Sequence, residues 1–486
     1  MKISLQSIGS QSYDYTIIGT GPAGLSLALA LEKKGKKVLI LEGGGYEFSS
    51  ISQSIYNGES IGTDYYSVMS SRLRFFGGTS NHWGGWCRPL SNIDLENFPI
   101  NKNDLDQYLS EASNILEISG KFDKDEVLNN DFEQIEFQFS PPVRFNKKYK
   151  KHIEQSGFIN LVLHANVLSI RGKNKNVEYI EVSDNYKKKY KLPVKNLIVA
   201  CGGIENSRLL LWSQLLSKDL FKHLKIGKSW MEHPSFFTGS ILGYTSKVFN
   251  FFSKIGDSLP APEIIHKDYS KKVFLQPSES LIREHSIGNA GLRLRLENSP
   301  SVLRRMVKEI ACLSPEYGQK LLSLVSQNLV CSMSILTVWE QKPSKENYIE
   351  LDLDKKDRYG IPRVKLNWKL RQVDKKTPLI CMEKLGDFFL DKDMGRVGML
   401  PYLMDTSEFS IENAVEGQGH HMGGTQMGNN ARNGVVDRNL KVFNVNNLWI
   451  AGSSVFPSGG HANPTLTIVQ LSLRLADHLI EIELDN

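Results

Sequence analysis

An apolar strand that runs into a glycine-rich turn near the start of the chain constrains the fold most. Residues 15–18 are apolar, and the turn that follows carries the spacing GxGxxG at Gly19, Gly21 and Gly24. Residues 22–33 have helical apolar spacing, and an apolar run at 37–42 ends in an acid. This order predicts a strand–helix–strand unit, and therefore a parallel sheet.

The glycine turn predicts a dinucleotide site. Gly19, Gly21 and Gly24, with Pro22 and Ala23 between them, allow a pyrophosphate to approach the backbone at a helix N-terminus. Glu42 ends the next strand, 18 residues after Gly24, where an acid accepts hydrogen bonds from ribose hydroxyls and repels a 2′-phosphate. The motif alone does not separate FAD from NAD.

Length and composition indicate a large globular protein without a nucleic-acid partner. The chain has 486 residues, 40% of them hydrophobic and 23% charged, which predicts two joined domains. The net charge of +6 is small for this length, and short basic runs such as 187–189 are expected in solvated loops.

The cysteine count and the N-terminus indicate a reducing compartment. The five cysteines are odd in number and include no close CxxC pair, so we expect neither a disulfide framework nor a metal site. The N-terminus lacks a secretory pattern, and no apolar stretch approaches the ~18 residues of a transmembrane span. A cytoplasmic protein without a transmembrane segment is the expectation.

The remaining chain leaves the first sheet and returns to it. Strands are predicted at 161–163, 167–170, 177–182 and 196–200, followed by a turn and a helix at 205–216. A middle region carries predicted helices at 301–310 and 317–327 and predicted strands at 330–339, 348–353 and 364–368. A strand at 448–451, a turn at Gly452 and a helix at 465–482 then rejoin the first sheet, so a substrate domain is inserted.

Two features of the C-terminal region favour FAD over NAD. A second glycine turn, at 452–456, follows a strand and would place backbone amides near a long dinucleotide. The segment 420–428, which begins His-His-Met-Gly, and the segment 463–467, Asn-Pro-Thr-Leu-Thr, carry the residues suited to chemistry. They lie at the far end of the chain, where a flavin ring would project.

These segments resemble the glucose–methanol–choline (GMC) oxidoreductases, with motifs nearest to bacterial sugar and pyranose oxidases and dehydrogenases. The matching residues are 13–47, 72–90, 160–234 and 412–482, roughly half of the chain. The resemblance implies an α/β fold in which a Rossmann-type FAD-binding domain carries an inserted α+β substrate domain built on an antiparallel sheet. The implied division is FAD-binding at 1–99, a cap segment at 100–157, FAD-binding at 158–235, the substrate domain at 236–411, and FAD-binding with catalytic residues at 412–486.

The resemblance places the chemistry on a histidine and an asparagine. Oxidation of an alcohol by a flavin needs a base for the hydroxyl proton, and histidine suits this with its ordinary pKa of ~6.5. Alignment on Met427 and Gly428 makes His420 the base, whereas alignment on Gly424 and Thr425 makes it His421; we prefer His420. Asn463 would hold the substrate oxygen, since an amide is a poor base.

The loop at 76–85 resembles the family segment beside the flavin ring. His82 aligns with a histidine that some relatives join covalently to the flavin, and Trp83 and Trp86 are expected to pack. His461 could reach the pocket or lie in a surface loop, and a structural role is favoured for His233. The cofactor-binding residues implied in full are Gly19, Gly21, Pro22, Ala23, Gly24, Glu42, Gly78, Thr79, Asn81, His82, Val167, Ala200, Gly202, Gly452, Ser453, Asn463 and Thr465.

The leading hypothesis is FAD-dependent oxidation of an alcohol group of a sugar, glycoside or polyol. Electrons would then pass to oxygen, a quinone or a protein carrier. The sugar substrate is inferred by analogy with the family. The alternatives are a flavin-dependent hydroxylase, a redox-neutral lyase, and a non-catalytic flavin-binding protein.

Overall fold

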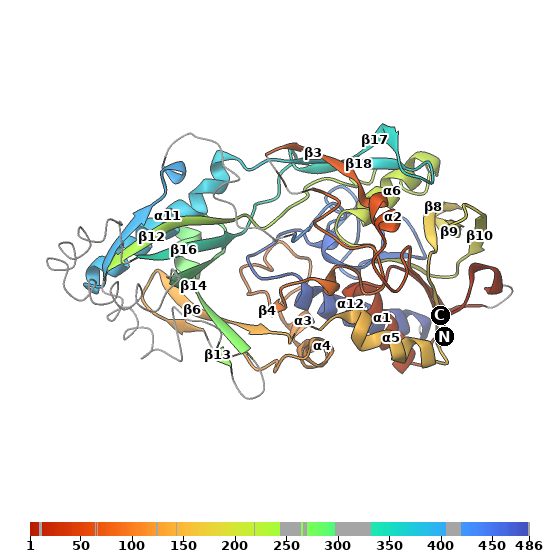
Figure 1. Ribbon diagram of the computed structural model, residues 1–486, viewed down its shortest axis with the longest axis horizontal. Coiled ribbons are helices and arrows are strands. Elements are labelled where there is room, and N and C mark those ends of the chain that lie inside the picture. The colour runs from red at the N-terminus through yellow and green to blue at the C-terminus, as the bar shows by residue number, and fades with distance from the viewer. Residues whose placement is uncertain are drawn as a thin grey trace.

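The chain folds into two lobes (Figure 1). The computed structural model describes residues 1–8, 12–63, 65, 67–122, 125–141, 143–217, 219–243, 264–265, 270–296, 332–404 and 419–484. One lobe holds a parallel sheet and both ends of the chain, and the other holds a large antiparallel sheet (Figure 1).

The parallel sheet has five strands in the order β20-β11-β1-β2-β7. All neighbouring pairs are parallel, with Ile17 beside Ile198 and Ile198 beside Trp449. The strands are short, apolar and almost wholly buried, as expected for a parallel sheet covered on both faces. Their bounds are β1 Tyr15–Ile18, β2 Val38–Leu41, β7 Ile159–Val162, β11 Leu197–Val199 and β20 Leu448–Ile450.

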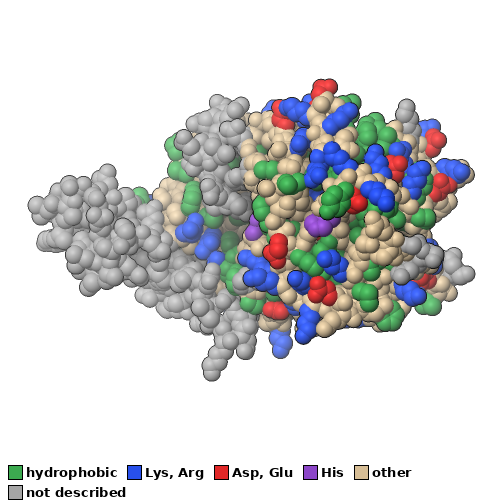
Figure 2. Space-filling model, turned by 45° about the vertical axis from the view of Figure 1, so that its right-hand side comes forward, with side chains coloured by type: hydrophobic (Ala, Val, Ile, Leu, Met, Phe, Trp, Pro, Cys, Tyr) green, Lys and Arg blue, Asp and Glu red, His purple; other side chains and the backbone are tan. Residues whose placement is uncertain are grey.

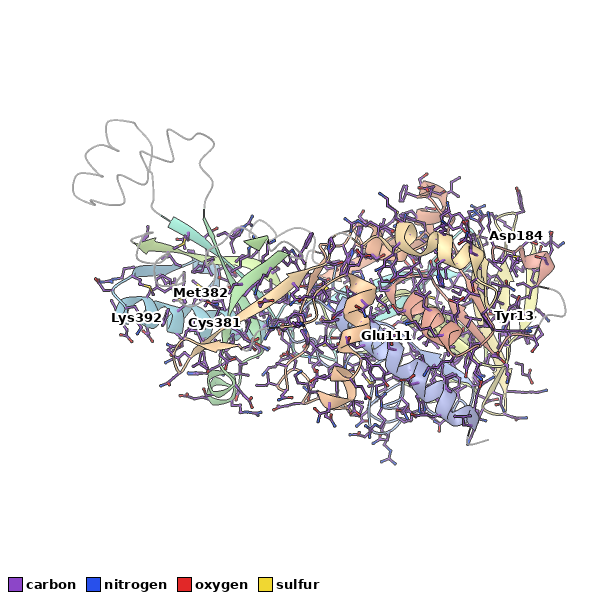
Figure 3. All side chains as sticks on the ribbon, turned by 90° about the horizontal axis from the view of Figure 1, so that it is seen from below. Tyr13, Glu111, Asp184, Cys381, Met382 and Lys392 are labelled. Carbon is purple, nitrogen blue, oxygen red and sulfur yellow. The ribbon has the colours of Figure 1, made fainter. Side chains whose placement is uncertain are left out.

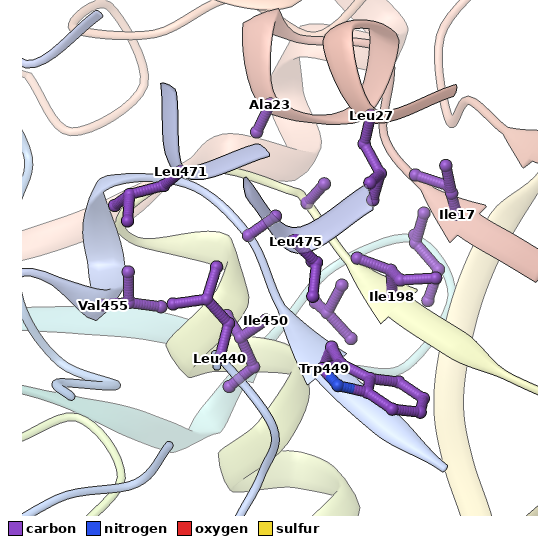
Figure 4. Close-up of a cluster of buried hydrophobic side chains, with 14 of the residues drawn as sticks. Ile17, Ala23, Leu27, Ile198, Leu440, Trp449, Ile450, Val455, Leu471 and Leu475 are labelled. Carbon is purple, nitrogen blue, oxygen red and sulfur yellow. The ribbon is translucent and has the colours of Figure 1, made fainter. Parts of the chain in front are cut away.

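Two helices from opposite ends of the sequence pack together on this sheet. They are α1, Pro22–Lys33, and α12, Thr465–Leu484. Their apolar side chains, with those of β1, β11 and β20, form the buried cluster of Figure 4, in which Leu27 and Leu475 lie among Ile17 and Ile198. Burial of such side chains contributes roughly 1.5–3 kcal/mol each. The start and the end of the chain are thereby held in one unit.

The carboxyl ends of the parallel strands meet at one edge of the sheet. The turns that follow β1, β2, β11 and β20 begin at Gly19, Glu42, Ala200 and Ala451. Ligands of parallel α/β sheets bind outside this edge. The sheet therefore brings four separate segments to one site.

The second lobe is built on a nine-stranded sheet, in which α11 (Gln372–Asp391) packs against β12, β16 and β19. Cys381 and Met382 of α11 lie in this lobe (Figure 3). The paired strands for which registers are given are antiparallel. The strand bounds are β4 Trp86–Cys87, β5 Glu126–Val127, β6 Phe132–Phe139, β12 Ser235–Gly243, β13 Ile264–Ile265, β14 Ser270–Pro277, β15 Ala290–Leu296, β16 Ser332–Trp339 and β19 Gly395–Met399.

Two three-stranded sheets and short helices complete the described residues. The sheets are β8 Asn166–Lys173 with β9 Asn176–Ser183 and β10 Lys189–Pro193, and β3 Gly58–Gly62 with β17 Tyr348–Lys356 and β18 Pro362–Trp368. The α-helices are α2 Ser50–Gln53, α3 Asn103–Asp106, α4 Leu109–Leu116, α5 Phe145–Gln155, α6 Glu205–Leu216 and α8 Glu279–His285. The 3₁₀ turns are η1 Leu5–Ser7, η2 Ser54–Tyr56, η3 Gly78–Asn81, η4 Pro401–Leu403 and η6 Ser453–Val455.

The predicted fold class is confirmed, and the elements around the site match their predictions. β1, α1, β2, β11, α6, β20 and α12 lie where the patterns placed them, within one or two residues. β10, β12 and α11 were not predicted: β10 is lysine-rich, β12 is interrupted by Gly239, and α11 contains Pro378. The predicted helices at 301–310 and 317–327 lie outside the described residues.

The division of the chain into five segments stays a prediction. Within 100–157, β6 belongs to the large sheet, whereas α3 and α4 contact α12 and α5 contacts β7. No helix within the described ranges is long and apolar enough to cross a membrane. Basic side chains are spread among acidic ones over the described part of the face in Figure 2.

Candidate active site

A cavity of about 790 Å³ lies at the carboxyl edge of the parallel sheet. This volume is within the roughly 300–1,000 Å³ of ligand and cofactor sites. Most of the predicted residues line it: Gly19, Gly21, Pro22, Ala23, Glu42, Gly78, Thr79, His82, Val167, Ala200, Gly202, His420, His421, Gly452, Ser453, Asn463 and Thr465. Gly24 and Asn81 are not in this lining.

The glycine turn is shaped to receive a ligand against its backbone. A Cβ atom on Gly24 would lie 2.1 Å from the Gly19 carbonyl oxygen, so Gly24 serves the packing of α1 on the turn. A Cβ atom on Gly21 would meet nothing within 4 Å, although Gly21 lies in the cavity wall at the N-terminus of α1. The bare backbone at Gly21 therefore faces open space, which fits a pyrophosphate.

Glu42 is fixed by hydrogen bonds at the same end of the cavity. Its carboxylate accepts the backbone N–H of Thr20 at 3.2 Å, the Thr20 hydroxyl at 2.5 Å and the backbone N–H of Gly44 at 2.8 Å. A carboxylate offers about four acceptor positions, so capacity remains for a ribose hydroxyl. The sequence suggested the acid but not these three donors.

Two arginines of the loop at 72–90 line the cavity and were not predicted as site residues. Arg74 lies against Gly43 and donates to Asn166 Oδ1 at 2.8 Å. Arg72 donates to Glu205 Oε1 at 2.8 Å, and both side chains are nearly buried. The arginine-rich sequence of this loop was the feature from which these two site residues could have been predicted.

The loop around His82 forms another part of the wall. Arg144 anchors it by donating to the carbonyls of Ser80 and Trp83 at 3.2 and 2.9 Å. Asn81 braces the turn by donating to the Phe76 carbonyl at 2.9 Å. His82 is an exposed residue of the cavity wall. Partial desolvation of its ring by the surrounding protein, and then the charge of Arg144, lower its pKa.

Trp83 and Trp86 pack as expected and also line the cavity. The indole N–H of Trp83 donates to the Val143 carbonyl at 3.0 Å. The Trp86 ring lies 4.8 Å from that of Phe139, centroid to centroid. Both indoles are partly exposed, so they give this side of the cavity an aromatic wall.

His420 and Asn463 meet in the cavity wall, as the sequence predicted. The Nε2 atom of His420 lies 3.0 Å from Nδ2 of Asn463, across 43 residues of sequence. The Nδ1 atom of His420 lies 2.9 Å from Nδ1 of His233. Burial, with smaller effects of His233 and His421, lowers the pKa of His420 well below its ordinary value, so the ring is neutral at pH 7.

The side chain of His421 has different hydrogen-bond partners from that of His420. Its Nε2 atom lies 3.0 Å from the Tyr65 hydroxyl, and that hydroxyl donates to Glu232 Oε2 at 2.6 Å. Glu232 is buried, and its burial raises the pKa of the carboxyl to about 7. Burial also lowers the pKa of His421 to about 3.

The backbone explains why these remote residues meet. Met231 and Met422 exchange two backbone hydrogen bonds, of 2.8 and 3.0 Å, which pair their segments in antiparallel fashion. Glu232 Oε1 then accepts the backbone N–H groups of His420 at 2.7 Å and His233 at 2.9 Å. Glu232 lies in the segment 231–234, which resembles a family segment, but the sequence drew attention only to His233 there, and no pattern pointed to Tyr65.

His233 and His461 are both buried, with exposed fractions of 1% and 3%. His233 contacts the predicted base directly, which is more than the structural role that the sequence favoured. His461 lies in neither of its expected places, since it is buried and absent from the cavity lining. Its ring packs edge-on to Phe137, and neither ring nitrogen has a hydrogen-bond partner among the described residues.

Fold and cavity together define a flavin-binding oxidoreductase scaffold, and family models agree with this class. A model described as "FAD binding domain" matches residues 14–57, and one described as "GMC oxidoreductase" matches residues 343–472. The resemblance to the GMC oxidoreductases is thereby confirmed, and FAD is the cofactor to which the site corresponds.

Individual relatives are distant in sequence. The fructose dehydrogenase large subunit of Gluconobacter japonicus is 25% identical over 66% of this chain and 53% of its own length. The 2-methyl-1,2-propanediol dehydrogenase of Mycolicibacterium austroafricanum is 24% identical over 66% of this chain and 54% of its own length. The matched region thus spans about half the length of each relative.

Solved structures show the same fold over nearly the whole chain. Pyridoxine 4-oxidase from Mesorbium loti matches with a TM-score of 0.57 and 14% identity, covering 96% of this chain and 99% of that one. A formate oxidase matches with a TM-score of 0.57 and 13% identity, covering 98% and 99%. At these identities the likeness concerns the fold alone.

Proposed function

We propose that this chain oxidises an alcohol with FAD, and that His420 is the general base. One observation carries the proposal: His420 Nε2 and the Asn463 amide lie 3.0 Å apart in the wall of a cavity whose other end is the glycine turn. A neutral imidazole beside an amide is suited to taking the proton of a hydroxyl held by both.

The cavity residues support FAD as the redox partner. The turn at Gly19 and Gly21 would hold the pyrophosphate, Glu42 the ribose, and Val167 with Ala200 the adenosine. Bound FAD supplies the acceptor for the hydride that leaves the carbinol carbon. The His82 loop, Ser453 and Thr465 would contact the remainder of the cofactor.

The protein groups have separate tasks in the reaction. In the protein alone, the Asn463 N–H donates to the lone pair of His420 Nε2. A substrate hydroxyl that replaces this direct contact would accept from Asn463 and donate to His420, so that the proton passes to Nε2 as the hydride leaves. General-base catalysis of this kind contributes roughly 10²–10⁴ in rate.

We further propose a sugar, glycoside or other polyol as the substrate. Both dehydrogenase relatives carry polyhydroxylated compounds in their names, fructose and a vicinal diol. The exposed faces of Trp83 and Trp86 in the cavity wall suit the apolar face of a sugar ring. Oxygen, a quinone or a carrier protein would then take the electrons.

An anaerobic substrate screen tests the proposal. Purified protein should be yellow, and its visible flavin absorbance should fall when the correct sugar, glycoside or diol is added without NAD(P)H. Readmitting air separates oxidase from dehydrogenase. If the colour is retained across the screen and turnover requires NAD(P)H, a hydroxylase is favoured. Turnover without loss of flavin absorbance would favour a lyase. If there is no turnover and no loss of absorbance, the protein binds flavin without catalysis.

A covalent bond between His82 and the flavin is a second, separable proposal. It is supported by the exposure of the ring in the cavity wall and by the resemblance of its loop. Acid-precipitated protein should stay yellow, whereas the His82→Ala variant should release its flavin to the supernatant when it is precipitated in the same way. Release of colour from the unaltered protein would exclude the bond and leave the His420 proposal untouched.

A further inference from the structure

His233 lies between a backbone carbonyl and the proposed base. Its Nε2 atom is 3.2 Å from the Gly459 carbonyl oxygen, and its Nδ1 atom is 2.9 Å from Nδ1 of His420. The two rings stand edge to face, with their planes 86° apart. The His233 ring is 1% exposed, and a Cβ atom on Gly459 would lie 3.3 Å from its Nε2. Little room remains for the ring to turn.

The positions of the protons follow from these contacts. A carbonyl oxygen only accepts, so the proton of His233 must be on Nε2. Burial lowers the pKa of His233 to about 4, and a neutral imidazole carries one N–H, so Nδ1 of His233 is a bare acceptor. The proton of His420 must therefore be on its Nδ1, where it donates to His233.

We propose that His233 is a positioning residue that fixes the tautomer of His420 and so presents the lone pair of His420 Nε2 to the substrate. This inference rests on the proposed function and names a residue that the resemblance assigned only to structure. The Asn463 amide agrees with it, since Nδ2 is the atom that faces Nε2 and only a donor can face a lone pair there.

Glu232 holds the same arrangement through the backbone. Its Oε1 atom accepts the N–H groups of both histidines, which keeps the two rings in register. The groups that face His420 are thus Glu232, His233, His421 and Asn463. Among them, His233 contacts the ring nitrogen opposite the one that takes the proton. Loss of this acceptor would free His420 to carry its proton on Nε2, where it cannot act as a base.

Two substitutions separate this role from simple packing. His233→Leu keeps bulk but removes the acceptor, whereas His233→Asn places an amide oxygen near the position of Nδ1. In anaerobic stopped-flow experiments with holoenzyme, we expect His233→Leu to slow flavin reduction by roughly 100-fold, an effect typical of groups that orient a functional histidine. Its FAD content and substrate Kd should stay unchanged. His233→Asn should recover most of the rate.

A spectroscopic measurement does not depend on turnover. Long-range ¹H–¹⁵N spectra of holoenzyme labelled at histidine, with the His420 signals assigned by their loss in His420→Gln, report which ring nitrogen carries the proton. The expected result is a protonated Nδ1 on His420 and a protonated Nε2 on His233. His461→Leu is the matched control, because it removes a buried ring that has no hydrogen bond among the described residues, and it should leave the His420 signals in place.

The outcomes distinguish the inference from the proposed function. Equal rates in His233→Leu and the unaltered enzyme, or a proton on Nε2 of His420, would overturn the inference. Full flavin reduction in His420→Ala would instead overturn the proposed base. If His233→Leu fails to fold, the tautomer in the unaltered holoenzyme still decides.

Discussion

The two ends of the cavity are built in different ways. At the nucleotide end, the single strand–helix–strand unit of residues 15–42 provides both a backbone turn and a carboxylate, which the hydrogen bonds from Thr20 to Glu42 join. At the reaction end, side chains from 65, 232–233, 420–421 and 463 form a hydrogen-bonded network. The first is a local shape and the second is a set of long-range contacts.

This difference separates what holds the cofactor from what performs the chemistry. A backbone cradle tolerates few changes in shape, because a Cβ atom on Gly19 or Gly24 would lie within 2.4 Å of a backbone carbonyl oxygen. The network depends instead on which proton lies on which nitrogen. Substitutions at the first end should therefore cost folding and cofactor content, and substitutions at the second should cost rate.

The largest expected effect belongs to the reaction end. His420→Ala should slow flavin reduction by roughly two to four orders of magnitude, since it removes the proposed base. The decrease in flavin absorbance after anaerobic mixing with substrate measures it. FAD content should be unaffected, because the glycine turn and Glu42 are untouched.

His421→Ala is the matched comparison for this substitution. The His421 ring bonds to Tyr65 and has no direct bond to Asn463 among those described, so its loss should reduce the rate far less. If the two variants exchange these results, the base is His421 and the alignment on Gly424 and Thr425 was the correct one.

At the nucleotide end, Gly24→Ala and Gly21→Ala should have opposite signatures. The new methyl group at Gly24 would lie 2.1 Å from the Gly19 carbonyl oxygen, which should destabilise the fold by about 3 kcal/mol. The same methyl group at Gly21 meets no protein atom within 4 Å, so the fold should survive while FAD binding weakens. Denaturant unfolding and flavin content measure the two effects. Equal loss of stability in both variants would contradict the assignment of Gly24 to packing and of Gly21 to cofactor binding.

The same contrast explains what the sequence could predict. The GxGxxG turn, α1, β2 and Glu42 follow from local pattern, because each element is specified by its own neighbours. His420 and Asn463 were found through family motifs, and their contact across 43 residues is a property of the fold. The five-segment division and the residue roles stay predictions.

The rest of the reaction end carried no local signal. The β-bridge pairing of Met231 with Met422 brings Glu232 beside His420 and His421. Tyr65 comes from a third segment and joins them through its hydrogen bonds to Glu232 and His421. Likewise, α11 was not predicted because Pro378 and its lysines obscure the helical period, which tertiary packing overrides. Periodicity reports which face is buried, but not which remote partner covers it.

A threonine pair tests how far the nucleotide end depends on a buried polar contact. Thr20 donates to Glu42 and accepts from the Gly77 backbone N–H at 3.1 Å, with an exposed fraction of 0%. Thr20→Val should therefore lower the free energy of unfolding by roughly 2 kcal/mol, as for a lost bond to a charged group. Thr467 is equally buried but its hydroxyl has no partner among the described residues, so Thr467→Val should cost almost nothing. Equal losses in urea titrations would show that the carboxylate contact is unimportant.

The smallest expected effect is a pH dependence that belongs to the reaction end. Burial lowers the pKa of His233 from 6.5 to about 4, so between these values the unfolded chain binds a proton that the folded protein does not. The contribution of His233 to the free energy of unfolding is therefore largest above pH 6.5 and decreases as the pH falls toward 4. Lowering the pH from 7.5 to 5.5 should cost about 1 kcal/mol through His233.

His233→Asn should lack this loss. Glu232, whose raised pKa of about 7 acts with the opposite sign, is present in both proteins and cancels in the difference. Urea unfolding of both proteins at the two pH values measures this difference, and an equal loss of stability in both would show that burial does not hold the pKa of His233 below its ordinary value.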